Sequence, residues 1–399
     1  MKKLDFPQGF LWGSATSAYQ VEGNNKNSDW WQWEHSEKRA YELRNQNKNP
    51  QEYFSGIACD SYNRFREDFD IAEKLHQNCH RLSIEWARIE PSVGKFEQKE
   101  IEHYREVLKD LKMRGIKTFV TLHHFTSPIW FMDLGGFEKR RNVEYFLEYV
   151  RKTTKELGDL MDFVCVINEA NVYAYDSYVR NNFPPQKNSL VAGFFVHQNL
   201  LFAHKKSFEE IKKMNPGIKV GVAHACWPAY FLGLHKIFNS TAEWLAYKYF
   251  FSAVKNHADF FGVNYYTHLG GTRFHPEVQA SDFGWEFFPE GLLKVLRELK
   301  KHQKEIYITE NGIADADDSK RFNYIQHHLL AIHQAISEDI AVKGYLYWSL
   351  LDNFEWAQGF TKKFGLVEID RQNKLARKIR LSAFEFAKIC ELNSMDLRQ

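Results

Sequence analysis

Residues 163–169 read Phe-Val-Cys-Val-Ile-Asn-Glu, an apolar run that ends in an acid. Short runs rich in β-branched and aromatic residues are typical of buried parallel strands, because helices cover both faces of a parallel sheet. A second run with a similar ending occupies residues 306–312, which read Ile-Tyr-Ile-Thr-Glu-Asn-Gly. Each run is therefore predicted to be a strand that leads into a glutamate flanked by asparagine, Glu169 in the first and Glu310 in the second.

Eight apolar runs of this kind recur along the chain, each followed by residues with helical spacing. The predicted strands are 10–16, 79–86, 117–125, 163–168, 219–225, 260–266, 305–309 and 344–350. Apolar residues repeat at three- and four-residue intervals within 62–75, 101–111 and 143–150, which predicts covering helices. No linker rich in proline, glycine or serine divides the chain. The pattern predicts an α/β fold, a single-domain (β/α)8 TIM barrel spanning residues 1–399, with its active site at the C-terminal rim.

The composition limits the kinds of partner. A net charge of +2, from 53 basic and 51 acidic residues, creates no field that would favour nucleic acid or an anionic membrane. The sequence has no apolar run long enough to span a bilayer and no signal-peptide core, so a cytoplasmic location is expected. The five cysteines include no Cys-x-x-Cys pair, and the His-His pairs at 123–124 and 327–328 are poorly placed to chelate one ion. We predict no metal and no cofactor, and the sequence indicates no oligomeric state.

The two strand-end glutamates are the candidate catalytic groups. A carboxylate at the rim of a barrel can reach a substrate without the full desolvation cost of a charge in the core. The alternative is a structural carboxylate that caps the next helix. Paired carboxylates suit glycosidic cleavage, because one stays protonated to assist the leaving group while the other attacks or activates water. Their separation, ~5–5.5 Å for retention or ~6.5–9.5 Å for inversion, does not follow from spacing in the sequence. Two longer segments after strands, 23–56 and 172–185, are predicted to be rim loops that help to build the site.

Seven stretches, in order, resemble one family of enzymes. They are Phe-Leu-Trp-Gly-Ser-Ala-Thr-Ser-Ala-Tyr-Gln at 10–20, Arg-Leu-Ser-Ile-Glu-Trp at 81–86, Thr-Leu-His-His-Phe at 121–125, Asn-Glu at 168–169, Gly-Val-Asn-Tyr-Tyr-Thr at 262–267, Ile-Thr-Glu-Asn-Gly at 308–312 and Trp-Ser-Leu-Leu-Asp-Asn-Phe-Glu-Trp at 348–356. From about residue 6 to about residue 386, the chain resembles glycoside hydrolase family 1, the β-glucosidase and β-galactosidase family. Members of this family retain the configuration of the anomeric carbon.

The resemblance implies a role for each matching residue. Glu310 would be the nucleophile, and Glu169 would be the acid that protonates the leaving oxygen and the base that then activates water. The groups that would support the nucleophile and the transition state are Asn168, Arg81, Tyr266 and Asn264. Among these, Asn168 matches the residue that holds the sugar 2-hydroxyl. The residues that would bind the sugar are Gln20, His124, Trp348, Glu355, Trp356 and Phe364.

The implied activity is that of an exo-acting, retaining β-glycosidase. Its substrates would be small-molecule or oligosaccharide β-glycosides with a terminal β-D-glucose, and also galactosides and fucosides. Relatives that cleave 6-phosphoglycosides carry a serine in place of Glu355 and a tyrosine in place of Phe364, so an unphosphorylated sugar is expected. Two alternatives stay open at this point. One is a transglycosidase that uses the same glycosyl-enzyme, and the other is a non-catalytic barrel that binds sugars.

The chain departs from the family pattern on the side of the leaving group. The acid is usually followed by proline and then by a tryptophan that helps to form the leaving-group site, whereas this chain has Ala170 and Asn171. The chain is also short between residues 266 and 305, so we expect an open entrance that accepts longer or bulkier leaving groups. Strict alternation would point Asn168 and Glu169 to opposite faces. The strand is therefore predicted to bulge or to end there.

Overall fold

A computed structural model describes residues 3–230, 237–270 and 280–396. Eight parallel strands form a closed barrel in the order of the sequence, which confirms the predicted fold class. The strands are β2 (Leu11–Ala15), β3 (Cys79–Ser83), β4 (Lys117–His123), β5 (Phe163–Asn168), β6 (Lys219–Ala225), β7 (Phe260–Asn264), β8 (Glu305–Asn311) and β9 (Val342–Trp348). Each corresponds to one predicted strand, although several ends differ by a few residues. The largest difference is in β3, which ends at Ser83 and not at Trp86, where α5 (Trp86–Ile89) begins. In contrast, β8 continues through Glu310 and does not stop before it.

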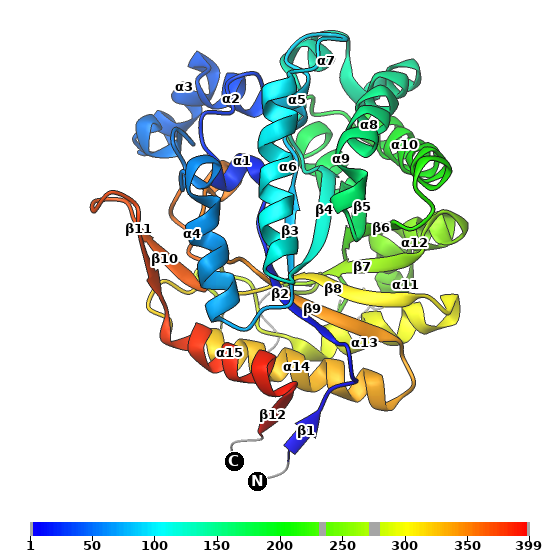
Figure 1. Ribbon diagram of the computed structural model, residues 1–399. Helices are drawn as coiled ribbons and strands as arrows, with labels where there is room; N and C mark the ends of the chain where they lie inside the picture. Colours follow the sequence, from blue (N-terminus) through cyan, green and yellow to red (C-terminus); the bar gives the residue numbers. More distant parts are fainter. Residues whose placement is uncertain (1–2, 231–236, 271–279, 397–399) are drawn as a thin grey trace.

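Amphipathic helices surround the barrel (Figure 1). The three predicted helices are present as α4 (Ser61–Lys74), α6 (Gln98–Met113) and α8 (Val143–Leu157). Further helices are α10 (Leu190–Met214), α12 (Tyr249–Val254), α13 (Pro289–Leu299), α14 (Arg321–Ser337) and α15 (Leu381–Leu392). In α6 the buried residues include Ile101, Tyr104, Leu108 and Leu111, which are the four apolar residues that predicted this helix.

Two small antiparallel sheets lie outside the barrel and were not predicted. β1 (Lys3–Asp5) pairs with β12 (Ser394–Asp396), and β10 (Val367–Asp370) pairs with β11 (Ala376–Ile379). Strands of three or four residues are too short to produce a periodic pattern in the sequence. The first sheet joins the two ends of the described chain, at the end of the molecule opposite α2 (Asp29–Glu34) and α3 (Glu37–Asn45) (Figure 1).

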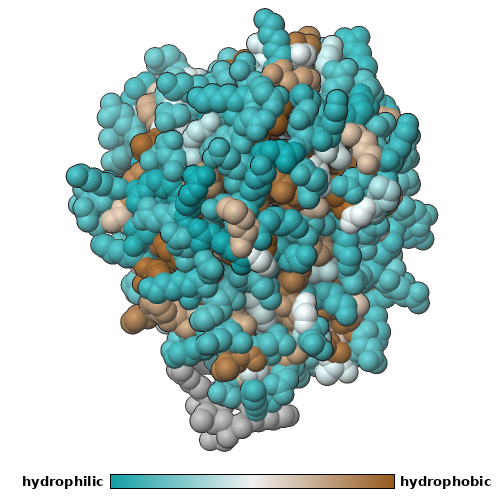
Figure 2. Space-filling model, in the orientation of Figure 1, coloured by the Kyte–Doolittle hydropathy of each residue, from teal (hydrophilic) through white to brown (hydrophobic). Residues whose placement is uncertain are grey.

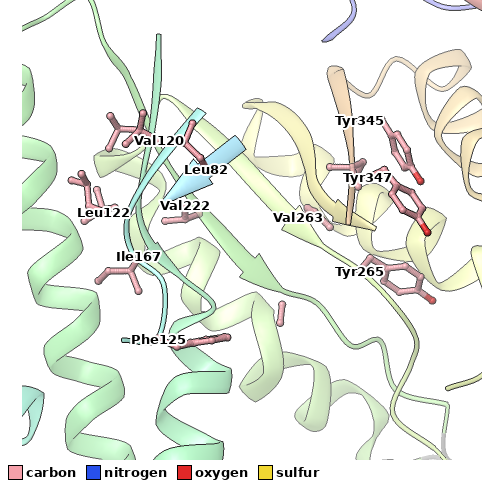
Figure 3. Close-up of a cluster of buried hydrophobic side chains, with 14 of the residues drawn as sticks. Leu82, Val120, Leu122, Phe125, Ile167, Val222, Val263, Tyr265, Tyr345 and Tyr347 are labelled. Atoms are coloured by element: carbon pink, nitrogen blue, oxygen red, sulfur yellow. The ribbon is translucent and has the colours of Figure 1, made fainter. Parts of the chain in front are cut away.

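Side chains inside the barrel change from apolar to polar along the strands. Phe119, Phe163, Phe260 and Tyr307 pack together in the interior, and the rings of Phe119 and Phe163 stack with centroids 4.1 Å apart. Residues of the opposite parity face outward, as Figure 3 shows for β4, where Val120 and Leu122 point toward the helices. Two residues beyond the apolar layer, β3 and β4 carry Arg81 and Thr121, whose side chains are hydrogen-bonded. The interior of the barrel therefore becomes polar toward its C-terminal rim.

The two long rim segments have regular structure. Residues 23–56 contain α2, α3 and the 3-10 turn η1 (Pro50–Tyr53). In the segment 172–185, residues 172–178 belong to α9 (Ala170–Tyr178). The face of the molecule in Figure 2 is mostly hydrophilic, with small separate hydrophobic patches. Within the described residues, no helix combines the length and the apolar character needed to cross a membrane.

Candidate active site

An irregularity in β5 brings Asn168 and Glu169 to the same pocket. The pairing of β5 with β6 shifts between Cys165 and Asn168, and β5 ends at Asn168. Glu169 has a φ of 44°, in the left-handed region that non-glycine residues seldom occupy. Its backbone N–H donates to the carbonyl oxygen of Ala223 on β6 at 2.7 Å. The prediction that the strand bulges or ends there is therefore confirmed, because β5 ends at Asn168 and both side chains line one pocket.

This pocket has a volume of about 940 Å³, within the range of small-molecule sites. Both rim segments contribute to its wall, with Arg39 and Lys48 from 23–56 and Tyr175 and Phe183 from 172–185. Most of the predicted site residues line it: His124, Asn168, Glu169, Tyr266, Glu310, Trp348, Glu355, Trp356 and Phe364. In the part of the chain that the structure covers, no three His, Cys, Asp or Glu side chains are grouped so that they could hold a metal ion.

Glu310 is buried and receives two strong hydrogen bonds. Arg81 Nη1 donates to Glu310 Oε1 at 2.5 Å, and the hydroxyl of Tyr266 donates to Oε2 at 2.7 Å. Burial raises the pKa of Glu310, whereas the positive charge of Arg81 and these hydrogen bonds oppose that rise. Arg81 and these hydrogen bonds therefore keep the pKa of Glu310 lower than burial alone would make it, which favours the ionised form.

Glu169 has a different environment. Burial raises its pKa well above the ordinary value, and the negative charge of Glu310 raises it further. This shift is opposed by the hydrogen bond from Asn264 Nδ2 to Glu169 Oε1 at 2.8 Å and by the charge of Arg81. The guanidinium of Arg81 is bonded instead to Glu310 and Asn168. When the two carboxyl groups share one proton, that proton therefore resides on Glu169.

Asn168 connects the two acids to His124. Its Oδ1 accepts from Arg81 Nη2 at 2.6 Å and from Asn264 Nδ2 at 3.1 Å. Its Nδ2 lies 3.1 Å from His124 Nε2. Burial lowers the pKa of His124 well below 6.5, and the charge of Arg81 lowers it further, so the ring is neutral. Because Nε2 then accepts from Asn168, the ring proton is on Nδ1, which is buried and has no partner among the described residues.

Three predicted site residues, Arg81, Asn264 and Gln20, are fully buried behind the residues that line the pocket. Arg81 and Asn264 act through Glu310, Asn168 and Glu169, as described above. Gln20 was predicted to bind the sugar, but both atoms of its amide are already engaged. Its Oε1 accepts from Ser17 Oγ at 2.7 Å, and its Nε2 donates to the carbonyl oxygen of Phe354 at 2.8 Å and lies 3.5 Å from Glu355 Oε2. Its Nε2 also donates to Asn353 Oδ1 at 3.0 Å, so Gln20 is bonded to the segment that carries Glu355. Burial raises the pKa of Glu355 to about 8, with a further contribution from the charge of Glu310.

Several aromatic residues of the pocket were missed by the sequence analysis. Phe283 and Trp285 stack with centroids 4.1 Å apart, and Trp285 lies 5.5 Å from the ring of Tyr266. They belong to the short segment between residues 266 and 305, which contains no motif and of which 271–279 lie outside the described residues. Trp227 also lines the pocket. It follows the predicted strand 219–225 by two residues, at the same rim as Glu169, and that position could have revealed it.

Two buried carboxyl groups with different surroundings, at the rim of a (β/α)8 barrel and among aromatic rings, define a glycoside hydrolase site. The sequence profile of glycosyl hydrolase family 1 matches residues 2–236 and 233–395. The chain belongs to this family and is a retaining O-glycosyl hydrolase.

Relatives of known name agree with this assignment. The chain is 31% identical to β-glucosidase A of Thermotoga maritima, over 99% of this chain and 100% of that protein. It is 28% identical to a 6-phospho-β-galactosidase of Clostridium acetobutylicum, over 96% of this chain and 97% of that one. The solved β-glycosidase from Pyrococcus horikoshii has 34% identity and a TM-score of 0.89, over 99% of this chain and 97% of that one. The alignment with the Thermotoga enzyme spans 457 residues, more than the 399 residues present here, so that enzyme has segments that this chain lacks.

Proposed function

We propose that this protein hydrolyses terminal, unphosphorylated β-D-glucosides, and the corresponding galactosides and fucosides, by double displacement. Glu310 is the nucleophile and Glu169 is the acid and base. The observation that carries this proposal is the difference between two buried carboxyl groups. Arg81 and Tyr266 bond to Glu310 and favour its charge, whereas burial and the neighbouring charge of Glu310 favour a proton on Glu169.

The first step forms a glycosyl-enzyme. A carboxylate oxygen of Glu310 attacks the anomeric carbon while the bond from that carbon to the leaving oxygen breaks. The proton of Glu169 moves to the leaving oxygen, which departs as an alcohol. Glu310 is now an uncharged ester, so its charge no longer raises the pKa of Glu169.

The second step reverses these roles. Glu169, now a carboxylate, removes a proton from water as the water oxygen attacks the anomeric carbon. The bond between that carbon and Glu310 breaks and restores the carboxylate. Glu169 ends with its proton, and the sugar leaves with its original β configuration. The change in charge on Glu310 is the physical reason why one glutamate can serve first as acid and then as base.

The sugar-binding part of the site offers hydrogen-bonding groups of several kinds. Asn168 Nδ2 has a second N–H beyond the one directed at His124, which suits the sugar 2-hydroxyl. The carboxyl group of Glu355 suits the neighbouring hydroxyls, and the ring of His124 lines the same pocket. Trp348 supplies an aromatic face under the ring, and Trp356 offers an indole N–H.

An unphosphorylated sugar fits the charge of this pocket. Glu310 is ionised in this pocket, and Glu355, whose pKa burial raises to about 8, also lines it, so a sugar phosphate would meet the charge of Glu310 and would oppose the ionisation of Glu355. We expect kcat/KM for an aryl β-glucoside to exceed that for its 6-phosphate by at least 100-fold. Replacement of Glu355 by serine should lower this ratio of the two kcat/KM values. A ratio that is unchanged in Glu355→Ser would show that this carboxyl group does not exclude phosphate.

The roles of the two glutamates can be separated by the choice of leaving group. In Glu169→Gln, formation of the glycosyl-enzyme from a dinitrophenyl β-glucoside should stay within about tenfold of the wild-type rate, because this leaving group needs no proton. The same variant should lose 100-fold or more on a methyl β-glucoside. Glu310→Gln should lose activity on both. An α-configured first product in NMR, or turnover in Glu310→Gln, would overturn the proposal.

A further inference from the structure

Trp227 stands at the pocket without a role in the mechanism above. It follows the end of β6 by two residues, is half-buried, and packs partly on the hydrophobic core. The remaining part of the side chain lines the pocket. We propose that Trp227 is a stacking surface for the leaving group, so that the enzyme favours glycosides whose leaving group is flat, such as an aromatic ring or a second pyranose. This inference rests on the proposed function, because it takes Glu169 as the acid.

The backbone around Trp227 is adjacent to that acid. Glu169 N–H donates to the carbonyl oxygen of Ala223, four residues before Trp227. Cys226 N–H donates at 2.9 Å to the carbonyl oxygen of Asn264, whose side chain donates to Glu169 Oε1. A general acid must be within hydrogen-bonding reach of the oxygen that it protonates. The leaving group therefore lies on the side of the pocket where Trp227 stands.

The segment that carries Trp227 is held on several sides. Asn171 Nδ2 donates to the carbonyl oxygens of Ala225 at 3.0 Å and Ala246 at 2.9 Å. Beyond Trp227, the carbonyl oxygen of Pro228 accepts from Leu269 N–H at 2.9 Å. The N–H of the next residue, Ala229, donates to Glu243 Oε1 at 3.0 Å. A ring on a fixed backbone loses little conformational entropy when a ligand stacks on it.

Asn171 occupies the position where the family pattern usually has a tryptophan that helps to form the leaving-group site. In the structure Asn171 instead fixes the end of β6, and Trp227, two residues beyond that end, supplies an aromatic ring on the same side. An indole ring binds the apolar faces of sugars and aryl groups by dispersion and burial of apolar surface, and it offers little to a small alkyl group.

The test compares leaving groups in wild-type protein, Trp227→Ala, Trp227→Phe and Trp244→Ala. Trp244 is a half-exposed control on η6 (Trp244–Lys248) that does not line the pocket. In Trp227→Ala we expect KM for phenyl β-glucoside and cellobiose to rise at least tenfold. KM for methyl β-glucoside and inhibition by glucose should change less than twofold. Trp227→Phe should recover most of the loss, and Trp244→Ala should resemble the wild type.

A binding measurement keeps this test independent of turnover. Phenyl and methyl β-thioglucosides, which resist cleavage, are titrated into the same proteins by calorimetry. The wild type should bind the phenyl compound more tightly, and Trp227→Ala should abolish that preference. An equal loss for both compounds, or no loss for either, would overturn the stacking role. If thioglucosides bind as expected but no β-glycoside is cleaved, the proposed function fails while the stacking surface stands.

Discussion

Tyr266 is the residue through which the charge state of Glu310 can be tested most directly. Its hydroxyl donates to Glu310 Oε2 at 2.7 Å, which lowers the pKa of that carboxyl group. In Tyr266→Phe the ionised form loses this hydrogen bond, so the pKa of Glu310 should rise. Hydrogen bonds to charged groups contribute about 1.5–3 kcal/mol, so the acidic limb of the kcat/KM profile should move upward by about one to two pH units. The measurement is kcat/KM for an aryl β-glucoside from pH 4 to pH 9.

Tyr265 provides the control for this variant. It is the neighbour in sequence and is fully buried, but its hydroxyl donates to the carbonyl oxygen of Phe288. Tyr265→Phe should therefore leave the acidic limb in place, even if it lowers stability. A limb that moves equally in both variants would mean that the shift comes from a general loosening of the site and not from the lost hydrogen bond.

Single residues of the site could be predicted where they end a strand, and less well where tertiary contacts decide their role. Glu169 and Glu310 follow apolar runs, and a strand end in a barrel points to one rim whatever the rest of the chain does. The sequence could not show that the amide of Gln20, which is predicted to bind the sugar, is bonded to Ser17 and Phe354. The position of Trp227, two residues after a predicted strand, indicates the rim, but the direction of its side chain depends on packing.

At the scale of elements, the strands were predictable because they are buried on both faces and most of them consist largely of apolar residues. The break in β5 at Asn168 was also predictable, because two neighbouring residues had to face one substrate. Its form was not, because the left-handed backbone of Glu169 depends on its hydrogen bond to β6. The strands β1 and β12 pair across almost the whole sequence, and no local pattern indicates such a partner.

Helix α2 carries a buried acid that should make stability depend on pH. Asp29 Oδ1 accepts from the N–H groups of Trp30 and Ser127, and Oδ2 has no partner among the described residues. Burial raises the pKa of Asp29 to about 8. The folded protein thus holds a proton that the unfolded chain releases near pH 4, so this stabilisation is full below pH 4 and is lost as pH rises through 8.

Asp29→Asn removes this titration. Compared with the variant, the wild type should lose unfolding free energy on the order of 2–4 kcal/mol between pH 5 and pH 8. Urea denaturation at pH 5, 6.5 and 8 measures the difference. Asp133→Asn, at the exposed end of α7 (Ile129–Asp133), serves as the control and should show a constant difference. If the Asp29→Asn difference is equally constant, Asp29 ionises in the folded protein as it does in the unfolded chain.

Across the whole molecule, one end of the barrel carries the pocket and the opposite end holds the two ends of the described chain together. The C-terminal rim carries the pocket, where Glu169 adopts an unfavourable backbone conformation and several carboxyl groups are buried together. At the opposite end, β1 and β12 join the beginning and the end of the described chain (Figure 1). Changes at that end should therefore affect stability and leave the geometry of the site intact.

Asn393 tests this separation. Its Oδ1 accepts from Trp12 Nε1 at 2.9 Å, its Nδ2 donates to the carbonyl oxygens of Phe6 and Pro7, and its φ is 49°. Asn393→Ala should lower the free energy of unfolding by about 2–3 kcal/mol, from lost hydrogen bonds and a strained backbone. Asn393→Gly relieves the strain and should lose about 1 kcal/mol less. Urea denaturation checks both values, and kcat/KM measured well below the transition should stay within twofold of the wild type. A tenfold fall in kcat/KM of either folded variant would show that the amino end of the barrel also shapes the site.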